Sequence, residues 1–196
     1  HLDINAFTLL LEKLHIIKIV KFIYNKILNK KNYPFDVKIT TGACCLIRRN
    51  SLEEIGGLID ERFYMYCEEF DLSRMLRKKG FNIAVIPKSI IIHLGGQTTF
   101  GTSINFLLQS YKSKFSYIKK HHGRLSSNIF SFLIIFLSIL YLIIYSTLLF
   151  ILFIINRNKI FLVKQKIFLN FHLLKLSLSK EKFNSRNLVF YYGQNK

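Results

Sequence analysis

The sequence has few cysteines, and their placement excludes two classes of protein. The three cysteines are Cys44, Cys45 and Cys67, and none belongs to a C-x-x-C pair or to a Cys/His set with metal spacing. This excludes a disulfide framework and a structural zinc site, and it is typical of proteins kept in a reducing cytoplasm. There is no internal repeat and no low-complexity segment either.

Acidic residues are also scarce, with 11 Asp and Glu against 29 Lys and Arg, which gives a formal net charge of +18. A charge of this size indicates a polyanionic partner, either nucleic acid or an anionic membrane surface. The apolar fraction of 51%, with 19 Phe, excludes a disordered basic tail. Because no nucleic-acid-binding motif is present, we expect a membrane partner and no nucleic acid.

Charge is absent altogether from residues 129–155, a run of 27 residues. A bilayer core needs roughly 20 apolar residues in a helix, so this run predicts one transmembrane helix. A basic juxtamembrane segment precedes it over 111–128, and a basic C-terminal tail follows over 156–196. The two flanks are too similar in charge to set the orientation, and the pattern leaves open whether the tail lies at the membrane interface.

Residues 1–34 predict a basic amphipathic helix followed by a linker. Apolar residues within 4–28 fall on one broad helical face, and most lysines fall on the opposite arc. The helix either lies on anionic lipid or packs on the body of the protein. The linker ends at Pro34, which stops the helix.

Residues 35–110 predict an α/β domain. The apolar and β-branched content of 36–48 predicts a buried strand, and 81–87 and 89–93 predict two short strands. The Ser51 to Glu54 spacing of a capping box predicts a helix that begins at Ser51 and stops at Gly56. A second helix is expected from about Glu68 to Gly80, with acids in its first turn and cations in its last.

Three carboxylates lie within four residues at the start of this second helix: Glu68, Glu69 and Asp71. Acids close to one another and to aromatic rings acquire raised pKa values, which suits a general base near neutral pH. A helix N-terminus has the opposite effect, because it stabilises the ionised form. Acids at this position are also common for structural reasons alone, and a single His such as His93 is commonly a structural hydrogen-bonding group.

An ordered series of short motifs connects these residues. It reads G-A-x-x-L-I-R-R from Gly42, I-G-G-x-x-D-E-R-F-x-x-Y-x-E-E-x-D-L from Ile55, and P-x-x-x-x-x-H-x-G-G from Pro87. The series resembles the C-terminal half of inverting family 2 glycosyltransferases, with the rhamnosyltransferase-like bacterial branch as the nearest pattern. The resemblance extends over roughly residues 37–124.

The resemblance implies a partial GT-A (Rossmann-like) domain followed by a transmembrane helix. In the family, the second acid of an E-D pair deprotonates the acceptor hydroxyl. Here that position is Glu69, after Glu68, so the carboxylate is kept but carries one more methylene. The other site residues carried over are Gly42 and Ala43 beside the sugar, Asp60, Glu61 and Asp71 around the acceptor loop, and His93 at a Mg²⁺ or Mn²⁺ ion or the diphosphate.

Two absences qualify the resemblance. No D-x-D metal motif precedes Gly42, so we expect the donor-binding half of the enzyme and the main metal ligands outside these residues, and no transfer by this chain alone. There is no Trp, so the Q-x-x-R-W motif of processive synthases cannot occur, which favours single-sugar addition.

The sequence therefore predicts a transferase anchored in the cell membrane, with its catalytic region on the cytoplasmic side. Its partners would be a nucleotide-sugar donor and a lipid-linked or cell-surface glycan acceptor. The alternative is a non-catalytic membrane scaffold, or a degenerate transferase whose acidic cluster is structural.

Overall fold

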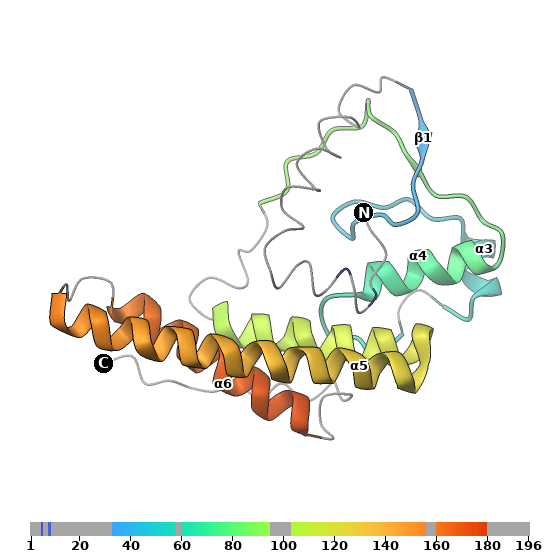
Figure 1. The fold of residues 1–196 in the computed structure, drawn as a ribbon. Helices are drawn as coiled ribbons and strands as arrows, with labels where there is room; N and C mark the ends of the chain where they lie inside the picture. The colour runs from blue at the N-terminus through green and yellow to red at the C-terminus, as the bar shows by residue number, and fades with distance from the viewer. Residues whose placement is uncertain are drawn as a thin grey trace. The chain divides into compact units, whose positions relative to one another are not determined.

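The computed structural model describes residues 5, 8, 33–57, 60–94, 103–155 and 160–179. It divides into two compact units, His1–Phe100 and Gly101–Lys196, each of which is taken by itself. The first unit contains β1 (Phe35–Asp36), α3 (Arg49–Glu54), α4 (Glu68–Lys78) and β2 (Ala84–Val85), and the second contains α5 (Ser103–Ile155) and α6 (Ile160–Leu178) (Figure 1). The amphipathic helix expected within 4–28 lies outside the described residues, apart from Asn5 and Thr8.

The sheet of the first unit is small. β1 pairs with β2 in antiparallel fashion, with Phe35 opposite Val85 and Asp36 opposite Ala84. One further bond, from the Val37 N–H to the Ile83 carbonyl at 2.8 Å, extends the pairing. The described residues are therefore mostly helical, and they do not show the Rossmann-like sheet that an α/β domain requires.

The prediction of strands over 36–48 and 89–93 is wrong for the described residues, where strands occur only at Phe35–Asp36 and Ala84–Val85. The physical reason is that these segments have no neighbouring strand to pair with among the described residues. A strand is stable only when its backbone groups pair with a neighbouring strand. Val37 and Ile39 are buried as expected, but Leu46 is fully exposed, and Ile90 and Ile92 are 86% and 89% exposed. The β-branched side chains are there, but no described strand lies beside them to bury them.

The helices of the first unit follow the sequence more closely. α4 begins at Glu68 as expected, and Gly80 follows its end with a φ of 85°, which an L side chain rarely adopts. α3 begins at Arg49 rather than Ser51, so the expected capping box does not form. The Ser51 hydroxyl instead donates to the Arg48 carbonyl at 2.6 Å, inside the helix.

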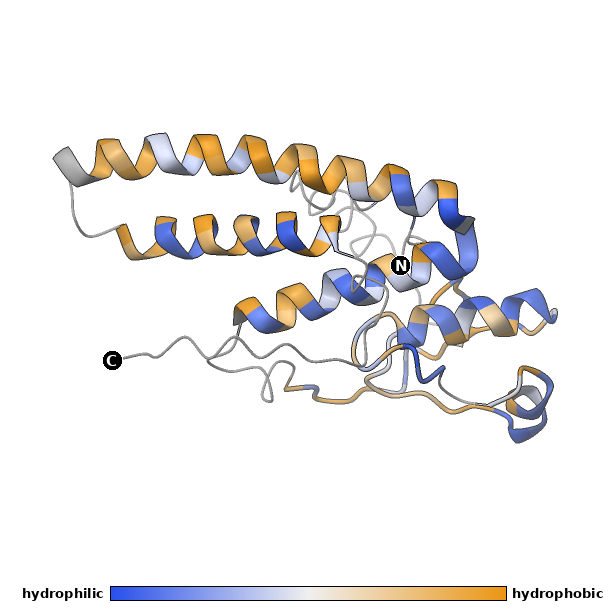
Figure 2. Ribbon diagram, turned by 90° about the horizontal axis from the view of Figure 1, so that it is seen from below, coloured by the Kyte–Doolittle hydropathy of each residue, from blue (hydrophilic) through white to orange (hydrophobic). Residues whose placement is uncertain are grey.

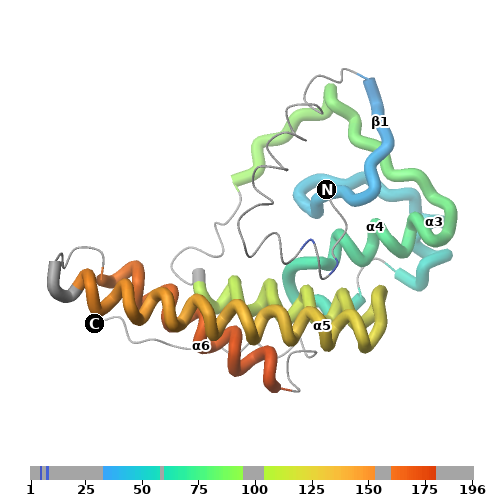
Figure 3. The backbone as a smooth tube through the Cα atoms, viewed as in Figure 1, coloured from blue at the N-terminus to red at the C-terminus, as the bar shows by residue number. Residues whose placement is uncertain are grey.

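The second unit is built from helices that fold back on one another. α5 bends at Gly123 (φ 82°, ψ 178°) into a first arm, 103–122, and a second arm, 124–155. The chain reverses at this bend (Figure 3), and the rings of Phe115 and Phe130 pack across it at 4.7 Å between centroids. α6 packs against α5 in turn.

The helix expected over 129–155 is the later part of the second arm and ends at Ile155 as predicted. Among the described residues, α5 is the one helix long and apolar enough to cross a membrane, judged by its length and composition. Its second arm is strongly hydrophobic along most of its length (Figure 2). The long helix thus agrees with the expected membrane association.

Candidate functional site

The predicted acids lie in the first turn of α4. Glu68 and Glu69 are its first two residues, and Asp71 is buried, with 4% of its surface exposed. The Asp71 N–H donates to the Cys67 carbonyl at 2.9 Å, which closes the first turn of the helix. The free N–H groups and dipole of this helix end favour carboxylates, which helps three acids to lie close together here.

The two residues before the helix have left-handed backbones. Tyr66 and Cys67 have φ values of 68° and 69°, and Cys67 serves as the N-cap without a side-chain capping bond. Such conformations cost about 1–3 kcal/mol for each residue that is not glycine, and they concentrate at functional sites. The sequence gives no signal for them, because neither residue is Gly, Asn or Asp. They fix the direction from which the chain enters α4, and hence where Glu68 and Glu69 lie.

Glu69 has the electrostatic surroundings of a base. The Oε2 atoms of Glu68 and Glu69 are both buried and have no hydrogen-bond partner in the part of the chain that the structure describes. Burial raises the pKa of Glu69 above its ordinary 4.5, the nearby Glu68 carboxylate raises it further, and a bond from its own N–H partly offsets both. A carboxylate held at a raised pKa with an uncommitted oxygen is suited to accept a proton.

The loop that contains Gly42 lies against the same helix turn. A methyl group added at Gly42 would lie 3.9 Å from Cβ of Glu69, which is ordinary van der Waals contact. The Thr40 N–H donates to the Ser73 hydroxyl of α4 at 3.3 Å and so attaches this loop to the helix. The Ala43 N–H donates to the Thr41 hydroxyl at 3.3 Å. The structure thus brings Gly42 and Glu69 together, although they are far apart in sequence.

Asp60 is engaged by a cation. Arg62 donates from Nε to both Asp60 carboxylate oxygens at 2.9 Å, and from its backbone N–H to one of them at 3.0 Å. This hydrogen bonding raises the pKa of Arg62 despite partial burial, and the charges of Asp60 and Asp71 add to the effect. Asp60 therefore shapes its own turn, and Glu61 beside it is exposed. A substrate role for either acid stays a prediction.

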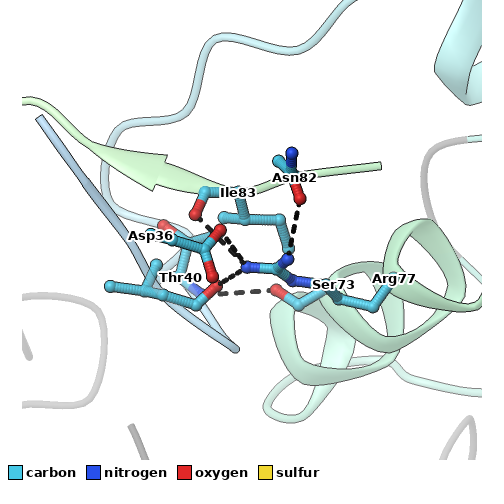
Figure 4. A network of polar contacts seen from close by, with 7 residues as sticks. Asp36, Thr40, Ser73, Arg77, Asn82 and Ile83 are labelled. Atoms are coloured by element: carbon cyan, nitrogen blue, oxygen red, sulfur yellow. Dashed lines mark hydrogen bonds and ion pairs between the residues drawn. The ribbon is translucent and has the colours of Figure 1, made fainter. Parts of the chain in front are cut away.

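Arg77 holds the unit together, and its role was not predicted from the sequence. From the last turn of α4 its guanidinium donates to the Asp36 carboxylate, to the Val37 carbonyl and, at 3.2 Å, to Asn82 (Figure 4). One side chain therefore joins α4 to the segments on either side of the small sheet. From the sequence, an Arg in the last turn of a helix predicts only a favourable interaction with the helix dipole. Asp36 lies 41 residues away, so no local sequence pattern predicts its contact with Arg77.

The metal assignment of His93 stays a prediction. His93 is exposed. No three His, Cys, Asp or Glu side chains among the described residues are placed to hold a metal ion. The described part of the chain does not fit a resident divalent cation by itself. Gly95 and Gly96, which follow His93 in the motif, lie outside the described residues.

Part of the chain is similar to a protein of known activity. Over 83 residues, 42% of the chain, it is 30% identical to the N-acetylglucosaminyl-diphospho-decaprenol L-rhamnosyltransferase of Mycobacterium tuberculosis, in strains CDC 1551 / Oshkosh and ATCC 25618 / H37Rv. The match spans about a quarter of the relative's length, 27%. No protein-family model matches the chain, and no solved structure matches it.

The similarity supports a glycosyltransferase-like relationship at a coarse level. It agrees with the motif resemblance in pointing to sugar transfer. Since the match covers only part of both proteins, the reaction of the whole relative is not transferred to this chain by the match alone.

Proposed function

We propose that this chain forms the acceptor-side part of a membrane-bound glycosyltransferase that adds a single sugar with inversion of configuration. The observation that carries the proposal is Glu69, at the motif position of the base: a half-buried carboxylate with a raised pKa and one oxygen that has no hydrogen-bond partner among the described residues. The partial similarity to a rhamnosyltransferase supports the same reaction class.

In this proposal Glu69 accepts the proton of an acceptor hydroxyl. The hydroxyl oxygen attacks the anomeric carbon of a nucleotide sugar from the side opposite the nucleoside diphosphate, which leaves with the electrons of its bond, so the configuration inverts. Glu68 acts through charge, because an adjacent carboxylate makes Glu69 a stronger base. Gly42, next to Glu69, leaves space on the same side of the helix turn for the reacting groups.

The proposed acceptor is a lipid-linked or cell-surface glycan, approached from the cytoplasmic side of the membrane. The name of the relative describes an acceptor of this kind, a sugar on a diphospho-polyprenol. The donor nucleotide and a Mg²⁺ or Mn²⁺ ion would be held mainly by polypeptide outside the described residues, with His93, Ala43, Asp60, Glu61 and Asp71 as contributors from this chain. No step of the mechanism is assigned to the cation.

The test is nucleoside diphosphate release in membranes that contain the full-length gene product. A panel of sugar nucleotides, L-rhamnose donors included, is offered with Mg²⁺ or Mn²⁺ and a polyprenyl-diphosphate-linked N-acetylglucosamine acceptor. We expect acceptor-dependent release that Glu69→Gln abolishes. Release that stays within a few-fold in Glu69→Gln would show that the base is another group.

The second candidate function is a non-catalytic membrane scaffold, or a degenerate transferase with a structural acidic cluster. The ion pair of Asp60 with Arg62 favours it, because that acid is already used to hold a turn. Absence of release with every donor, from folded protein supplied with acceptor, would support this candidate.

A further inference from the structure

α6 buries three uncharged polar side chains and exposes five large apolar ones, with Lys164, Lys166 and Lys175 exposed as well. Asn170, His172 and Ser177 are buried, with at most 9% of their surfaces exposed, alongside Leu173 and Leu176. The exposed face carries large hydrophobic residues: Phe161, Leu162, Phe168, Phe171 and Leu178, between 39% and 69% exposed. A helix on the surface of a water-soluble protein has the opposite arrangement. The medium around α6 is therefore apolar.

Two of the buried polar side chains of α6, Asn170 and His172, bond to the helix itself. Asn170 Nδ2 donates to the Lys166 carbonyl at 2.8 Å, and His172 Nδ1 lies 2.9 Å from the Phe168 carbonyl. The His172 ring also packs on the Phe168 ring at 3.9 Å between centroids. In hydrocarbon, where no water is present, polar groups must be satisfied within the protein. The bonds of Asn170 and His172 meet that requirement.

The later part of the α5 second arm also exposes large apolar side chains. No described side chain between Ile139 and Leu152 is buried, and the exposed ones include Ile143, Phe150 and Ile151. Half-buried side chains, among them Tyr141, Tyr145 and Leu149, lie on one helical face, and α6 packs against α5, so the other faces are the ones open to the medium. The Thr147 hydroxyl donates to the Ile144 carbonyl at 2.8 Å, again within the helix.

The lengths fit a bilayer. Residues 139–155 and α6 are 17 and 19 residues long, which is about 25 Å and 28 Å in helix, against a hydrocarbon core of about 30 Å. Only residues 156–159 connect the two helices, and α6 packs against α5, so α6 must run back toward the level of the Gly123 bend.

The charges lie near the two ends of this pair. Arg157 and Lys159 are in the connection, and Lys164 and Lys166 follow in the first two turns of α6, close enough for long side chains to reach the headgroups. Lys119, Lys120 and Arg124 flank the bend, and Lys175 is in the last turn of α6. No Asp or Glu occurs between Asp71 and Glu181, so this whole stretch suits anionic lipid headgroups.

We infer that α6 is a second membrane-embedded helix, which forms an antiparallel hairpin with residues 139–155. Lipid acyl chains cover the exposed apolar faces of both helices. The connection 156–159 lies at the membrane face opposite Arg124, and the chain after Leu178 returns to the face of Arg124. The three lysines of α6 lower its mean hydropathy, so hydropathy alone does not identify it as a membrane helix. The features that do are its exposed large apolar side chains and its buried polar ones.

The test of topology uses single cysteines and a membrane-impermeant maleimide in sealed vesicles. In a background with Cys44, Cys45 and Cys67 replaced by Ser, the positions are Asn128→Cys near the bend, Asn158→Cys in the connection and Gln194→Cys in the tail. We expect 128 and 194 to be labelled from one face and 158 from the other. Labelling of 158 and 194 from the same face, or of all three from one face, overturns the hairpin.

A second measurement keeps the native cysteines and uses the absence of Trp in the sequence. Phe168→Trp on α6 and Phe150→Trp on α5 report depth through quenching by lipids brominated deep in the acyl chain, with Tyr64→Trp of the first unit as control. We expect both helix variants to be quenched equally and the control to be unaffected. If Phe150→Trp is quenched and Phe168→Trp is not, α6 lies outside the hydrocarbon and the inference is wrong.

Discussion

The two units of this chain use polar side chains in opposite ways. In the first unit, polar groups reach across the chain: Arg77 joins three segments, Ser73 holds the Gly42 loop, and Glu69 keeps a buried oxygen without a partner. In the second unit, Asn170, His172 and Thr147 bond back to the backbone of their own helix. The first pattern agrees with the proposed site, and the second agrees with the proposed apolar medium, in which polar groups must be satisfied within the protein.

Acidic residues divide in the same way. Glu68, Glu69 and Asp71 cluster in the first unit, whereas no Asp or Glu occurs between residues 72 and 180. A carboxylate inside a bilayer is costly, so its absence from this stretch agrees with the proposed membrane helices. The clustered carboxylates of the first unit agree with the proposed general base.

The largest effect that separates the units is expected from Glu69→Gln. Loss of a general base lowers turnover by about 10²-fold or more, since general acid–base catalysis contributes roughly 10²–10⁴-fold. The measurement is nucleoside diphosphate release in the membrane assay described above. Glu54→Gln, an exposed acid at the end of α3, is the matched control and keeps full turnover. Equal losses in both variants would contradict a specific role for Glu69.

The matched test of the second unit is Ser138→Leu against Ser146→Leu, eight residues apart in the same arm. Ser138 is fully buried and Ser146 is exposed. Overpacking at Ser138 should cost about 1–3 kcal/mol, because helices in a membrane pack closely through small residues. Ser146→Leu should leave stability unchanged. The measurement is loss of helical circular dichroism on heating in detergent, and equal midpoints would contradict the packed arrangement.

Arg77→Ala tests the polar contacts that hold the first unit. It leaves the Val37 carbonyl without its donor and should cost about 2 kcal/mol, as hydrogen bonds to charged groups do. The control is Arg49→Ala, which breaks an exposed pair with Glu53 and should cost less than about 0.5 kcal/mol. Hydrogen exchange of the α4 amides reports both, and faster exchange in Arg49→Ala alone would refute the role of Arg77.

A smaller effect is expected from two glycines of the first unit. Gly80→Ala forces an L side chain into a φ of 85° and should cost about 1 kcal/mol. Gly42→Ala makes only an ordinary contact at 3.9 Å, so we expect no loss of stability. Any loss of turnover in Gly42→Ala then reflects the space beside Glu69, which thermal unfolding and the release assay distinguish.

The smallest effect is the pH dependence of stability at Glu69. Its pKa is raised in the folded chain, so the folded state holds the proton more tightly than the unfolded state. The stabilisation is present below the ordinary pKa of 4.5 and is lost as pH rises through the raised value. Glu69→Gln should therefore stabilise the chain at pH 8 and not at pH 4, as thermal unfolding at the two pH values would show. Equal shifts at both values would contradict the raised pKa.

The sequence by itself determined the features that depend on neighbouring residues. The acid-rich start and glycine stop of α4 set that helix, and the charge-free run 129–155 set the long helix of the second unit, because hydrophobicity and capping act over a few residues. The motif series also led to the reaction class that the partial similarity supports.

Only the tertiary structure decided the rest. The strands expected over 36–48 and 89–93 have the right residues, but a strand depends on a partner that local pattern cannot supply. The contact of Gly42 with Glu69, the reach of Arg77 to Asp36 and the return of α6 along α5 join residues far apart in sequence. Such contacts depend on how the whole chain folds, and so does the left-handed turn at Tyr66 and Cys67, which neither residue favours by itself.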